Sequence, residues 1–518
     1  MFPALKTIFA FLIITTSTFV EVIDSARILG LFPTPFKSHL IIHSAIADAL
    51  VERGHEVTVV ATLPKINKHS QFRHIQLNID EFSPTLLAAY INNPPPLYKK
   101  YTFFMNEINR YTNDSLHHEA MQKLMREESF DLVIQGFILN EFLLGVAAHF
   151  KCPVVMSFMI RTLPRVNNLV GNPHEIAYVP GLMSGGNQPM GFFDRLEHFV
   201  CVNFLENGVV KYIEQSNQKR FYDANFPPEK YPSYEDMLKN ISLVFTNYHF
   251  SQGSIRPYVP GLIEIGGIQI KDKLSPLPED IKTVLDNSSE HGVIYFSVGS
   301  NIHSSKLDPI KVKIIFDFLS KLPQTILWKW DNSNYPGKSP NIVYKTWLPQ
   351  ESVLSHPNVR LFLTHGGQGS VVESQFYGVP MVGVPMFGDQ PANMANVEQQ
   401  GFGLSVKFDT LTEEKFTTAI REVLTNKKYT QNVRKFANLY KDRPMTARQT
   451  AVFWIEYVLR HHGAAHLQSP SVHLNAFQLL SLDVIGFLIA VLYIIWKILK
   501  ICLTLVLRLI FKRKRKTE

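Results

Sequence analysis

The stretch from residue 359 to residue 403 constrains the fold of this chain more than any other part. It opens with a short β-like run, Val359 to Leu363, which stops at the tetrapeptide THGG of residues 364–367. Paired glycines permit a sharp turn, and a helix is expected to begin just after them. A second apolar run, MVGVPMF at residues 381–387, follows. The stretch therefore predicts one βα unit and a further strand, with polar side chains at the end of the first strand.

The glycine turn is a place where an anion can bind. A helix that starts after such a turn offers unpaired backbone N–H groups and the positive end of its dipole. His365 lies beside this position as a further donor, and Asp389 and Gln390 lie in the loop after the second run. A carboxylate and an amide suit sugar hydroxyls, so these residues predict a site for a nucleotide sugar or another phosphate. The alternative is an ordinary βα crossover with His365 and Asp389 on the surface.

A longer motif makes the stretch specific. The run THGGQGSVVESQFYGVPMVGVPMFGDQ, preceded by WLPQ at residues 347–350, closely resembles the UDP-glycosyltransferases, membrane-bound enzymes of the insect and vertebrate type. The resemblance covers almost the whole chain, from Arg27 to the tail. It implies an α/β protein with two Rossmann-like domains facing each other across a cleft, the GT-B arrangement. It also implies inverting transfer of a hexose from a UDP-sugar to a small lipophilic acceptor, with the UDP-sugar as co-substrate and with no cofactor or metal.

Composition excludes several other classes. The chain has 518 residues, 46% of them hydrophobic, which is enough for two or more buried domains. Of the net charge of +8, the segment from Lys497 onward carries +7, so a basic patch for nucleic acid is not expected and the charge is typical of a membrane flank. Three cysteines cannot build a disulfide framework, and one bridge between Cys152 and Cys201 or two free thiols are both open.

Both ends of the chain carry targeting features. Residues 1–25, with Lys6 before a short apolar run, have the pattern of a cleaved secretory signal, and an uncleaved anchor is the alternative. A lumenal chain would offer Asn113, Asn240 and Asn287 as glycosylation acceptors. Residues 481–507 predict one transmembrane helix, with an amphipathic surface helix as the alternative. The basic residues 508–518 predict a cytoplasmic tail.

The final residues KRKTE resemble a retrieval signal to the endoplasmic reticulum. Together, these features predict a single-pass protein of the endoplasmic reticulum membrane whose catalytic part is lumenal. A homo-oligomer is left open.

The first half opens as a βαβ unit. A strand at residues 27–32 leads to His39 at the start of a helix that ends near Arg53, and residues 57–61 form the next strand. His39 therefore lies at the carboxyl edge of the sheet, where open α/β sheets bind ligands and where an imidazole can act as a general base. A capping or exposed histidine is the alternative, and the resemblance places the family's catalytic histidine on His39.

The partner of that histidine is less clear from the sequence. Gly136 occupies the place where vertebrate members carry an aspartate, and the next acid is Glu141. A glutamate can orient a histidine and stabilise its imidazolium, so Glu141 is the predicted partner. The alternative is an acid that the macrodipole favours in a first helical turn. One helix is expected from about residue 106 to residue 128, and the aromatic residues between 161 and 232 wall an acceptor cleft or form a core.

The second half is expected to bind the donor. By resemblance, Ser300 lies near the diphosphate, Trp347 stacks on uracil, Gln350 reads the uridine and Glu373 binds the ribose hydroxyls. Gly369 stands where many members have asparagine, so Gln368 or Ser370 would supply a polar contact. The charge of the leaving UDP would be met by His365 and by the helix start at residues Gly367, Gln368, Gly369 and Ser370.

These predictions divide the chain at the polar link of residues 271–278. An acceptor domain covers residues 26–275, a donor domain residues 276–445, and a helix returning to the first domain plus a linker residues 446–480. The insect-type resemblance favours UDP-glucose, while glucuronic acid stays open because the motif has no obvious basic partner for a carboxylate. An inactive membrane-anchored binder of small lipophilic molecules is the alternative, supported by Gly136 and Gly369. An NAD-dependent oxidoreductase is weaker, because no GxGxxG fingerprint is present.

Overall fold

The chain folds around two parallel β-sheets, each flanked by helices. A computed structural model describes residues 25–80, 91–92, 96–181 and 188–514, so the predicted signal peptide and the last residues of the tail lie outside the described residues. The first sheet has the strand order β3-β2-β1-β4-β5-β6-β7 and the second the order β10-β9-β8-β11-β12-β13. Both are doubly wound, which confirms the prediction of two Rossmann-like domains.

The first sheet is buried on both faces, as parallel sheets usually are. All of its strand pairs are parallel, and the order reverses between β1 and β4. Its strands are β1 (Arg27–Phe32), β2 (Glu56–Ala61), β3 (Arg73–Gln76), β4 (Leu132–Gly136), β5 (Val154–Phe158), β6 (Ile241–Thr246) and β7 (Leu262–Glu264).

The second sheet repeats this topology with its reversal between β8 and β11. Ligands of doubly wound sheets bind at the carboxyl ends of the strands beside such a reversal. The strands are β8 (Val293–Ser297), β9 (Thr325–Lys329), β10 (Ile342–Lys345), β11 (Val359–Thr364), β12 (Met381–Gly383) and β13 (Gly403–Ser405).

The helices of the first domain differ from the prediction at His118, where the chain breaks between two helices. The stretch predicted as a single helix is two helices, because His118 has extended backbone angles and its Nδ1 accepts from the N–H of Ala120 at 3.2 Å. The elements are α2 (Lys37–Arg53), α4 (Leu97–His117), α5 (Glu119–Glu127), η1 (Glu141–Leu143), α6 (Leu144–Phe150), α7 (Pro164–Val170), α8 (Phe192–Val200), the π-helix η2 (Cys201–Val210), α9 (Lys211–Asn225) and α10 (Tyr234–Lys239).

The second domain places its helices on both faces of its sheet. They are α11 (Glu279–Asp286), α12 (Pro309–Leu319), α13 (Gln350–Leu354), α14 (Gln368–Tyr377), α15 (Gln390–Gln399), α16 (Glu413–Thr425) and α17 (Lys427–Lys441). The turn of residues 364–367 joins β11 to α14, which is the βα unit that the sequence predicted.

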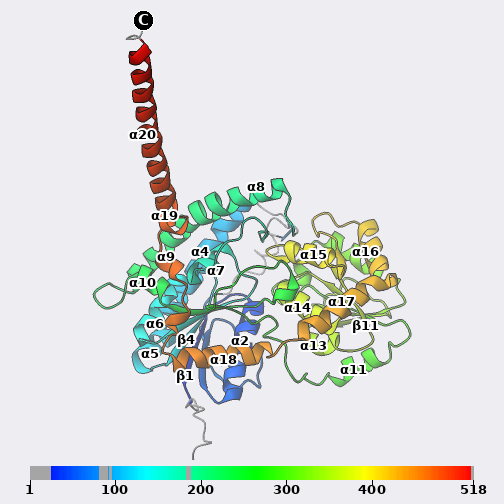
Figure 1. Ribbon diagram of the computed structural model, residues 1–518. Coiled ribbons are helices and arrows are strands. Elements are labelled where there is room, and N and C mark those ends of the chain that lie inside the picture. Colours follow the sequence, from blue (N-terminus) through cyan, green and yellow to red (C-terminus); the bar gives the residue numbers. More distant parts are fainter. Residues whose placement is uncertain (1–24, 81–90, 93–95, 182–187, 515–518) are drawn as a thin grey trace, which may run out of the picture.

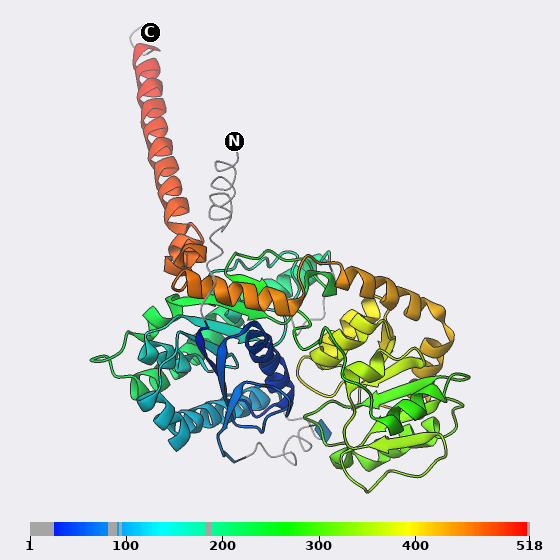
Figure 2. The same ribbon diagram turned by 90° about the horizontal axis from the view of Figure 1, so that it is seen from below.

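Helix α18 (Ala447–Arg460) crosses from the second domain back to the first, along the lower side of the molecule in Figure 1 and across the first domain in Figure 2. Ile455 is fully buried in the core of the first domain. Arg448 donates to Glu52 at 2.8 Å, and Arg53 donates to Glu456 at 2.9 Å. The helix therefore packs on α2, the helix that carries His39.

The chain then leads to a long helix that projects from the first domain (Figure 1). The linker is held by the Ser471 hydroxyl, which donates to the carbonyl of Gly171 at 2.9 Å. After the short α19 (Ala476–Leu479), α20 (Leu482–Lys514) begins. Its segment Leu482–Leu509 is long and apolar enough to cross a membrane, and none of that window is buried in the protein.

One expectation for the first domain needs correction, and one open alternative is resolved. Phe192, Phe193, Phe199 and Phe204 neither wall a cleft nor form a core, because they are exposed on the outer side of α8 and η2. The cysteine alternatives are resolved in favour of free thiols, because Cys152, Cys201 and Cys502 are all unbridged.

Candidate active site

His39 lies in the first turn of α2, just after the carboxyl end of β1. Its side chain is half-buried, and burial lowers the pKa of the imidazole to about 3. Nδ1 lies 3.3 Å from the hydroxyl oxygen of Thr34, and the ring of Phe36 packs edge-on at 5.0 Å. The imidazole is therefore neutral at pH 7 and able to accept a proton.

The two residues before His39 reach the second domain. Nδ2 of Asn301, which follows Ser300 after β8, donates to the hydroxyl of Ser38 at 2.9 Å. Nζ of Lys37 lies 3.9 Å from the centre of the Trp347 ring, a cation–π contact. The start of α2 thus lies against the loops predicted to bind the donor.

The structure does not bring Glu141 to His39. Both carboxylate oxygens of Glu141 accept from Arg165, with Nε at 2.9 Å from Oε1 and Nη2 at 2.6 Å from Oε2. Arg165 also forms an ion pair with the buried Glu214. Among the described residues, Glu141 makes no contact with His39, so the predicted pairing is corrected: Glu141 joins α7 and α9 to the end of β4.

His43, and not His39, is the histidine beside Gly136. A Cβ atom built on Gly136 would lie 2.9 Å from Nε2 of His43, so an aspartate could not be placed there unless His43 moved. The buried His43 ring stacks on Phe32 at 4.8 Å, and its Nδ1 lies 3.1 Å from the hydroxyl of Ser157. The glycine is therefore explained by the close approach of this ring.

The turn after β11 places His365 at the start of α14. His365 is half-buried, desolvation lowers the pKa of its imidazole to about 3, and its buried Nδ1 atom has no hydrogen-bond partner among the described residues. The ring packs on Gly299, which has φ +87°, and a Cβ atom there would lie 2.6 Å from the ring. Gly299 directly precedes Ser300, so the loops after β8 and β11 meet at this ring, with Gly367 as the N-cap of α14.

Lys329, at the end of β9, is a site residue that the sequence reasoning missed. Its Nζ donates to the carbonyl of Gly299 and lies 5.1 Å from the centre of the Trp347 ring. Burial, and then the charge of Lys37, lowers the pKa of Lys329 to about 8. The sequence feature that could have identified Lys329 is its position, since it is a basic residue at the carboxyl end of a strand in the second sheet.

Gln350, Ser370 and Glu373 form one hydrogen-bonded group. Nε2 of Gln350 donates to Oε2 of Glu373 at 2.8 Å and to the hydroxyl of Ser370 at 3.2 Å. The hydroxyl of Tyr295 donates to Oε1 of Gln350 at 3.1 Å. Burial, and then the nearby charge of Glu351, raises the pKa of Glu373 to about 8. The structure thus joins two residues that the sequence assigned to the nucleoside, Gln350 and Glu373.

Asp389 lies next to the start of α14. Burial raises its pKa, while its carboxylate accepts from the backbone N–H of Gln368 and from Asn393 at 2.7 Å. The Gln390 side chain is structural in part, because its Oε1 accepts from the N–H of Met386 at 2.8 Å. There is space for a side chain at Gly369, since the atom nearest to a Cβ built there would be 3.9 Å away.

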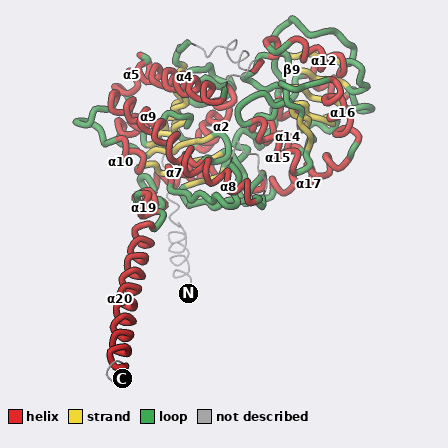
Figure 3. The backbone as a smooth tube through the Cα atoms, turned by 90° about the horizontal axis from the view of Figure 1, so that it is seen from above, coloured by secondary structure: helices red, strands yellow, loops and turns green. Residues whose placement is uncertain are grey.

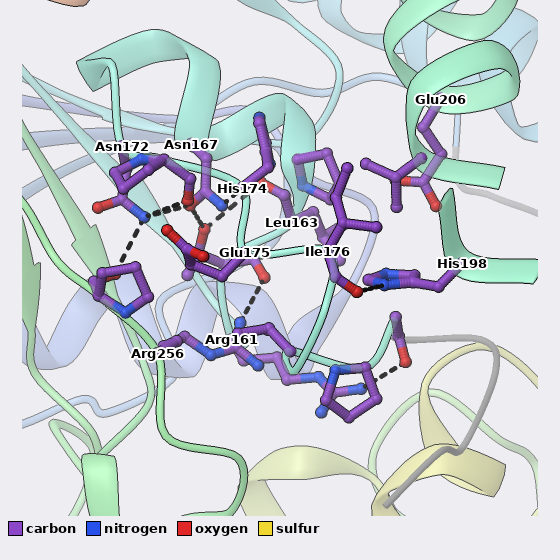
Figure 4. Close-up of a pocket in the computed structure, with 18 residues that line it drawn as sticks. Arg161, Leu163, Asn167, Asn172, His174, Glu175, Ile176, His198, Glu206 and Arg256 are labelled. Atoms are coloured by element: carbon purple, nitrogen blue, oxygen red, sulfur yellow. Dashed lines mark hydrogen bonds between the residues drawn. The ribbon is translucent and has the colours of Figure 1, made fainter. Parts of the chain in front are cut away.

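A cavity of about 50 Å³ lies beneath α8 and η2 in the first domain (Figure 4). Arg161, Arg256 and His198 are among its lining residues, and Nη1 of Arg256 donates to the carbonyl of Thr162 at 3.2 Å. It holds a few water molecules at most, which is far less than the several hundred Å³ of a pocket for a small organic ligand. In this conformation it is therefore not a complete acceptor site.

The described residues show no preformed metal centre. Among them, no group of three or more His, Cys, Asp and Glu side chains is placed to bind a metal ion.

Comparisons with known proteins agree with this geometry. The family model described as UDP-glucoronosyl and UDP-glucosyl transferase matches residues 28–517. The chain is 32% identical to UDP-glycosyltransferase UGT5 of Dactylopius coccus over 97% of both proteins. It is 31% identical to UDP-glucosyltransferase 2 of the same organism, over 91% of this chain and 92% of the relative.

A solved structure supports the fold. Spinosyn forosaminyltransferase SpnP aligns with a TM-score of 0.57 at 14% identity, covering 84% of this chain and all of that one. The predicted GT-B arrangement is confirmed. Because the family model spans nearly the whole sequence and relatives above 30% identity cover it from end to end, this chain belongs to the UDP-glucoronosyl and UDP-glucosyl transferase family and is a glycosyltransferase that uses a UDP-sugar.

Proposed function

We propose that the chain transfers glucose from UDP-glucose, with inversion, to the hydroxyl of a small lipophilic acceptor such as a phenol. The observation that carries the proposal is the contact of the α2 start, through Lys37 and Ser38, with the donor loops at Trp347 and Asn301. This contact brings a neutral imidazole to the edge of the donor site. The relative named UDP-glucosyltransferase 2 supports glucose as the sugar.

In this mechanism His39 is the general base. With Nδ1–H donating to the Thr34 hydroxyl, Nε2 is free to take the acceptor's proton. The acceptor oxygen forms a bond to the anomeric carbon as the bond from that carbon to the UDP oxygen breaks, and UDP leaves with the electron pair. Thr34 is the positioning residue, in place of Glu141. A phenol gives up its proton to an imidazole more readily than an aliphatic alcohol does, because a phenol is the stronger acid, which favours phenolic acceptors.

The leaving diphosphate would meet positive charge that the protein has already desolvated. Lys329 donates to the carbonyl of Gly299, against which the His365 ring packs, Lys37 lies against Trp347, and α14 begins directly after the turn. A neutral His365 can donate one N–H to a phosphate oxygen. Such preorganised donors stabilise charge that develops in a transition state. In the proposal, Ser300, Gly367, Gln368, Gly369 and Ser370 line the diphosphate, while Asp389 and Gln390 face the sugar.

The proposal extends to the rest of the chain. Residues 26–275 bind the acceptor and residues 276–445 the donor, and the stretch 446–480 ties the donor domain to the acceptor domain. Helix α20 anchors the protein in the endoplasmic reticulum membrane with the catalytic part in the lumen. The apolar length of α20 and the basic tail support this orientation.

A donor competition tests the choice of sugar. Microsomes that carry the chain are given UDP-glucose or UDP-glucuronic acid with a panel of phenols, and UDP release is measured. We expect acceptor-dependent release with UDP-glucose at least about tenfold faster, a difference of about 1.4 kcal/mol in transition-state stabilisation. Equal or faster release with UDP-glucuronic acid contradicts the choice of glucose. Binding of UDP without release from any acceptor would favour the inactive binder.

The variant His39→Ala tests the base. We expect kcat to fall by at least about 100-fold, the usual contribution of a positioned general base, while the Kd for UDP changes less than about threefold. The control is His69→Ala, which removes an exposed histidine of a surface loop and should turn over like the parent. A His39→Ala protein with parental kcat excludes His39 as the base.

The raised pKa of Glu373 predicts a pH-dependent affinity for UDP. If the ionised carboxylate accepts from the ribose hydroxyls, UDP binding lowers this pKa and releases a proton. Affinity should therefore rise between about pH 7 and 8, by up to about tenfold, and level off above about pH 8, in a range where the phosphates are already ionised. Calorimetry in buffers of different ionisation enthalpy measures the proton. In Glu373→Gln both the slope and the released proton should disappear, and a flat wild-type profile contradicts the assignment.

The lumenal orientation predicts which asparagines carry glycans. Asn240 and Asn287 are exposed at the ends of α10 and α11. Asn113 lies inside α4, and its Oδ1 accepts from Asn225 at 3.3 Å. Glycosidase treatment should shift the chain by two glycans, one lost in Asn240→Gln and one in Asn287→Gln, with no change in Asn113→Gln. An unglycosylated chain in cells contradicts the lumenal placement.

A further inference from the structure

The continuous helical segment α8–η2–α9 buries several polar side chains and exposes a run of apolar ones. Its protein-facing side chains include His198, Glu214 and Gln218, all buried. Nδ1 of His198 lies 3.0 Å from the carbonyl oxygen of Ile176, and Glu214 is paired with Arg165. Gln218 accepts from the N–H of Phe142 at 3.2 Å and donates to Asn109 at 2.8 Å. Polar side chains therefore make an unusually large share of the contacts between this segment and the domain, beside the buried apolar Val202 and Tyr222.

The opposite side of the segment is apolar and exposed. Phe193 is 78% exposed, Phe204 60% and Tyr212 74%. Every exposed position from 199 to 213 is apolar or glycine, and the charged exposed residues of the segment lie on either side of this run, in α8 and in the later part of α9. Leaving one such large side chain in water instead of burying it costs about 1.5–3 kcal/mol. A contiguous stripe of this size on one helix marks a surface that something apolar covers.

The π-helix keeps the stripe in line. Exposed apolar residues recur four or five positions apart through η2, at Val200, Phe204, Leu205, Val209 and Ile213. An α-helix would rotate residues with this spacing off a common face, whereas the wider turn of the π-helix holds them on it. The exposed face of η2 thus continues that of α8 without a break.

This face lies on the side of the molecule from which α20 projects. Figure 1 shows α8 along the edge from which α20 rises, and Figure 3, turned by 90°, again shows α8 and α20 on one side. Helix α7 joins the two: Asn168 of α7 donates to Asn207 of η2 at 3.2 Å, and Ser471, in the linker to α20, bonds to Gly171 at the end of α7. A bilayer that held α20 would therefore face α8 and η2.

We propose that the exposed face of α8–η2–α9 is a second membrane contact, which lies in the bilayer interface with its aromatic side chains among the lipids. The inference rests on the proposed anchoring of α20. Phe and Tyr side chains on a helix that lies in the membrane plane are typical of such contacts. The stripe from Phe199 to Ile213 has no exposed basic residue, so the contact is with the acyl region and not with anionic headgroups.

Single-cysteine labelling of the full chain tests this contact. One protein carries Phe204→Cys with Cys152→Ala, Cys201→Ala and Cys502→Ala, and a second carries Ile310→Cys in the same background. Ile310 is the matched control, since it is a 72% exposed apolar residue on the second domain. A third protein keeps Cys502 on α20 as its only thiol. Each is labelled with a bimane fluorophore and reconstituted in phosphatidylcholine vesicles, with nitroxide on the acyl chains or with iodide in the water.

We expect the acyl nitroxide to quench the label at position 204 at least about twofold and the label at 310 hardly at all, with iodide giving the reverse order. Iodide quenching at 204 equal to that at 310, or protection of 204 from both quenchers by a second copy of the chain, overturns the proposal. The Cys502 label reports on the α20 anchor separately. If the acyl nitroxide quenches the label at 502 but not the label at 204, the second membrane contact is rejected and the anchoring of α20 is not. Tyr212→Cys repeats the test if the label at 204 lowers the thermal unfolding midpoint.

Discussion

The proposed site depends on how α2 is held, because the proposed base and the proposed phosphate-binding turn belong to different domains. The first turn of α2 is fixed by the second domain, through the Ser38–Asn301 hydrogen bond and the Lys37–Trp347 contact. Its last turn is fixed by α18, which pairs with Glu52 and Arg53. Exposed ion pairs contribute little individually, so the buried apolar face of α18 supplies most of this attachment. A helix restrained at both ends keeps the imidazole at a defined distance from the donor loops.

Desolvation sets the charge states around that helix. Burial keeps His39 and His365 neutral, lowers the pKa of Lys329 and raises that of Glu373. Burial is the largest cause of each of these pKa shifts, because the charged form of each group is poorly solvated in the empty site. A ligand with a diphosphate at one end and hydroxyls at the other would supply partners for these groups. The diphosphate would pair with the lysines, and the hydroxyls would favour the ionised carboxylate of Glu373. In the proposed site, the same burial that destabilises the free protein therefore favours a nucleotide diphosphate as ligand.

The sequence predicted the parts of the site that are local. The glycine turn and the start of α14 follow from residues 364–370, and the position of His39 follows from one strand and one loop. Glu141 was misassigned because its partner, Arg165, lies 24 residues away on another helix, and no local pattern shows that contact. Lys329 was missed because its role arises from strand order, which brings the end of β9 beside β8. The segment α8–η2–α9 escaped recognition because its apolar face points outward.

The segment α8–η2–α9, in the proposed membrane contact, links the membrane to the domain proposed to bind the acceptor. His198 and Val202 line the small cavity beneath it, while Phe199 and Phe204 face the opposite way. If the outer face is in lipid, only the thickness of one helix separates the bilayer from the cavity. A lipophilic acceptor partitions into the bilayer, so its concentration beside this helix exceeds that in water. The cavity of about 50 Å³ is too small to hold such a molecule while α8 and η2 stay in place. The inner face of the segment combines the polar contacts of His198 and Gln218 with the buried apolar side chains of Val202 and Tyr222, so both kinds of contact would have to change before the cavity could widen.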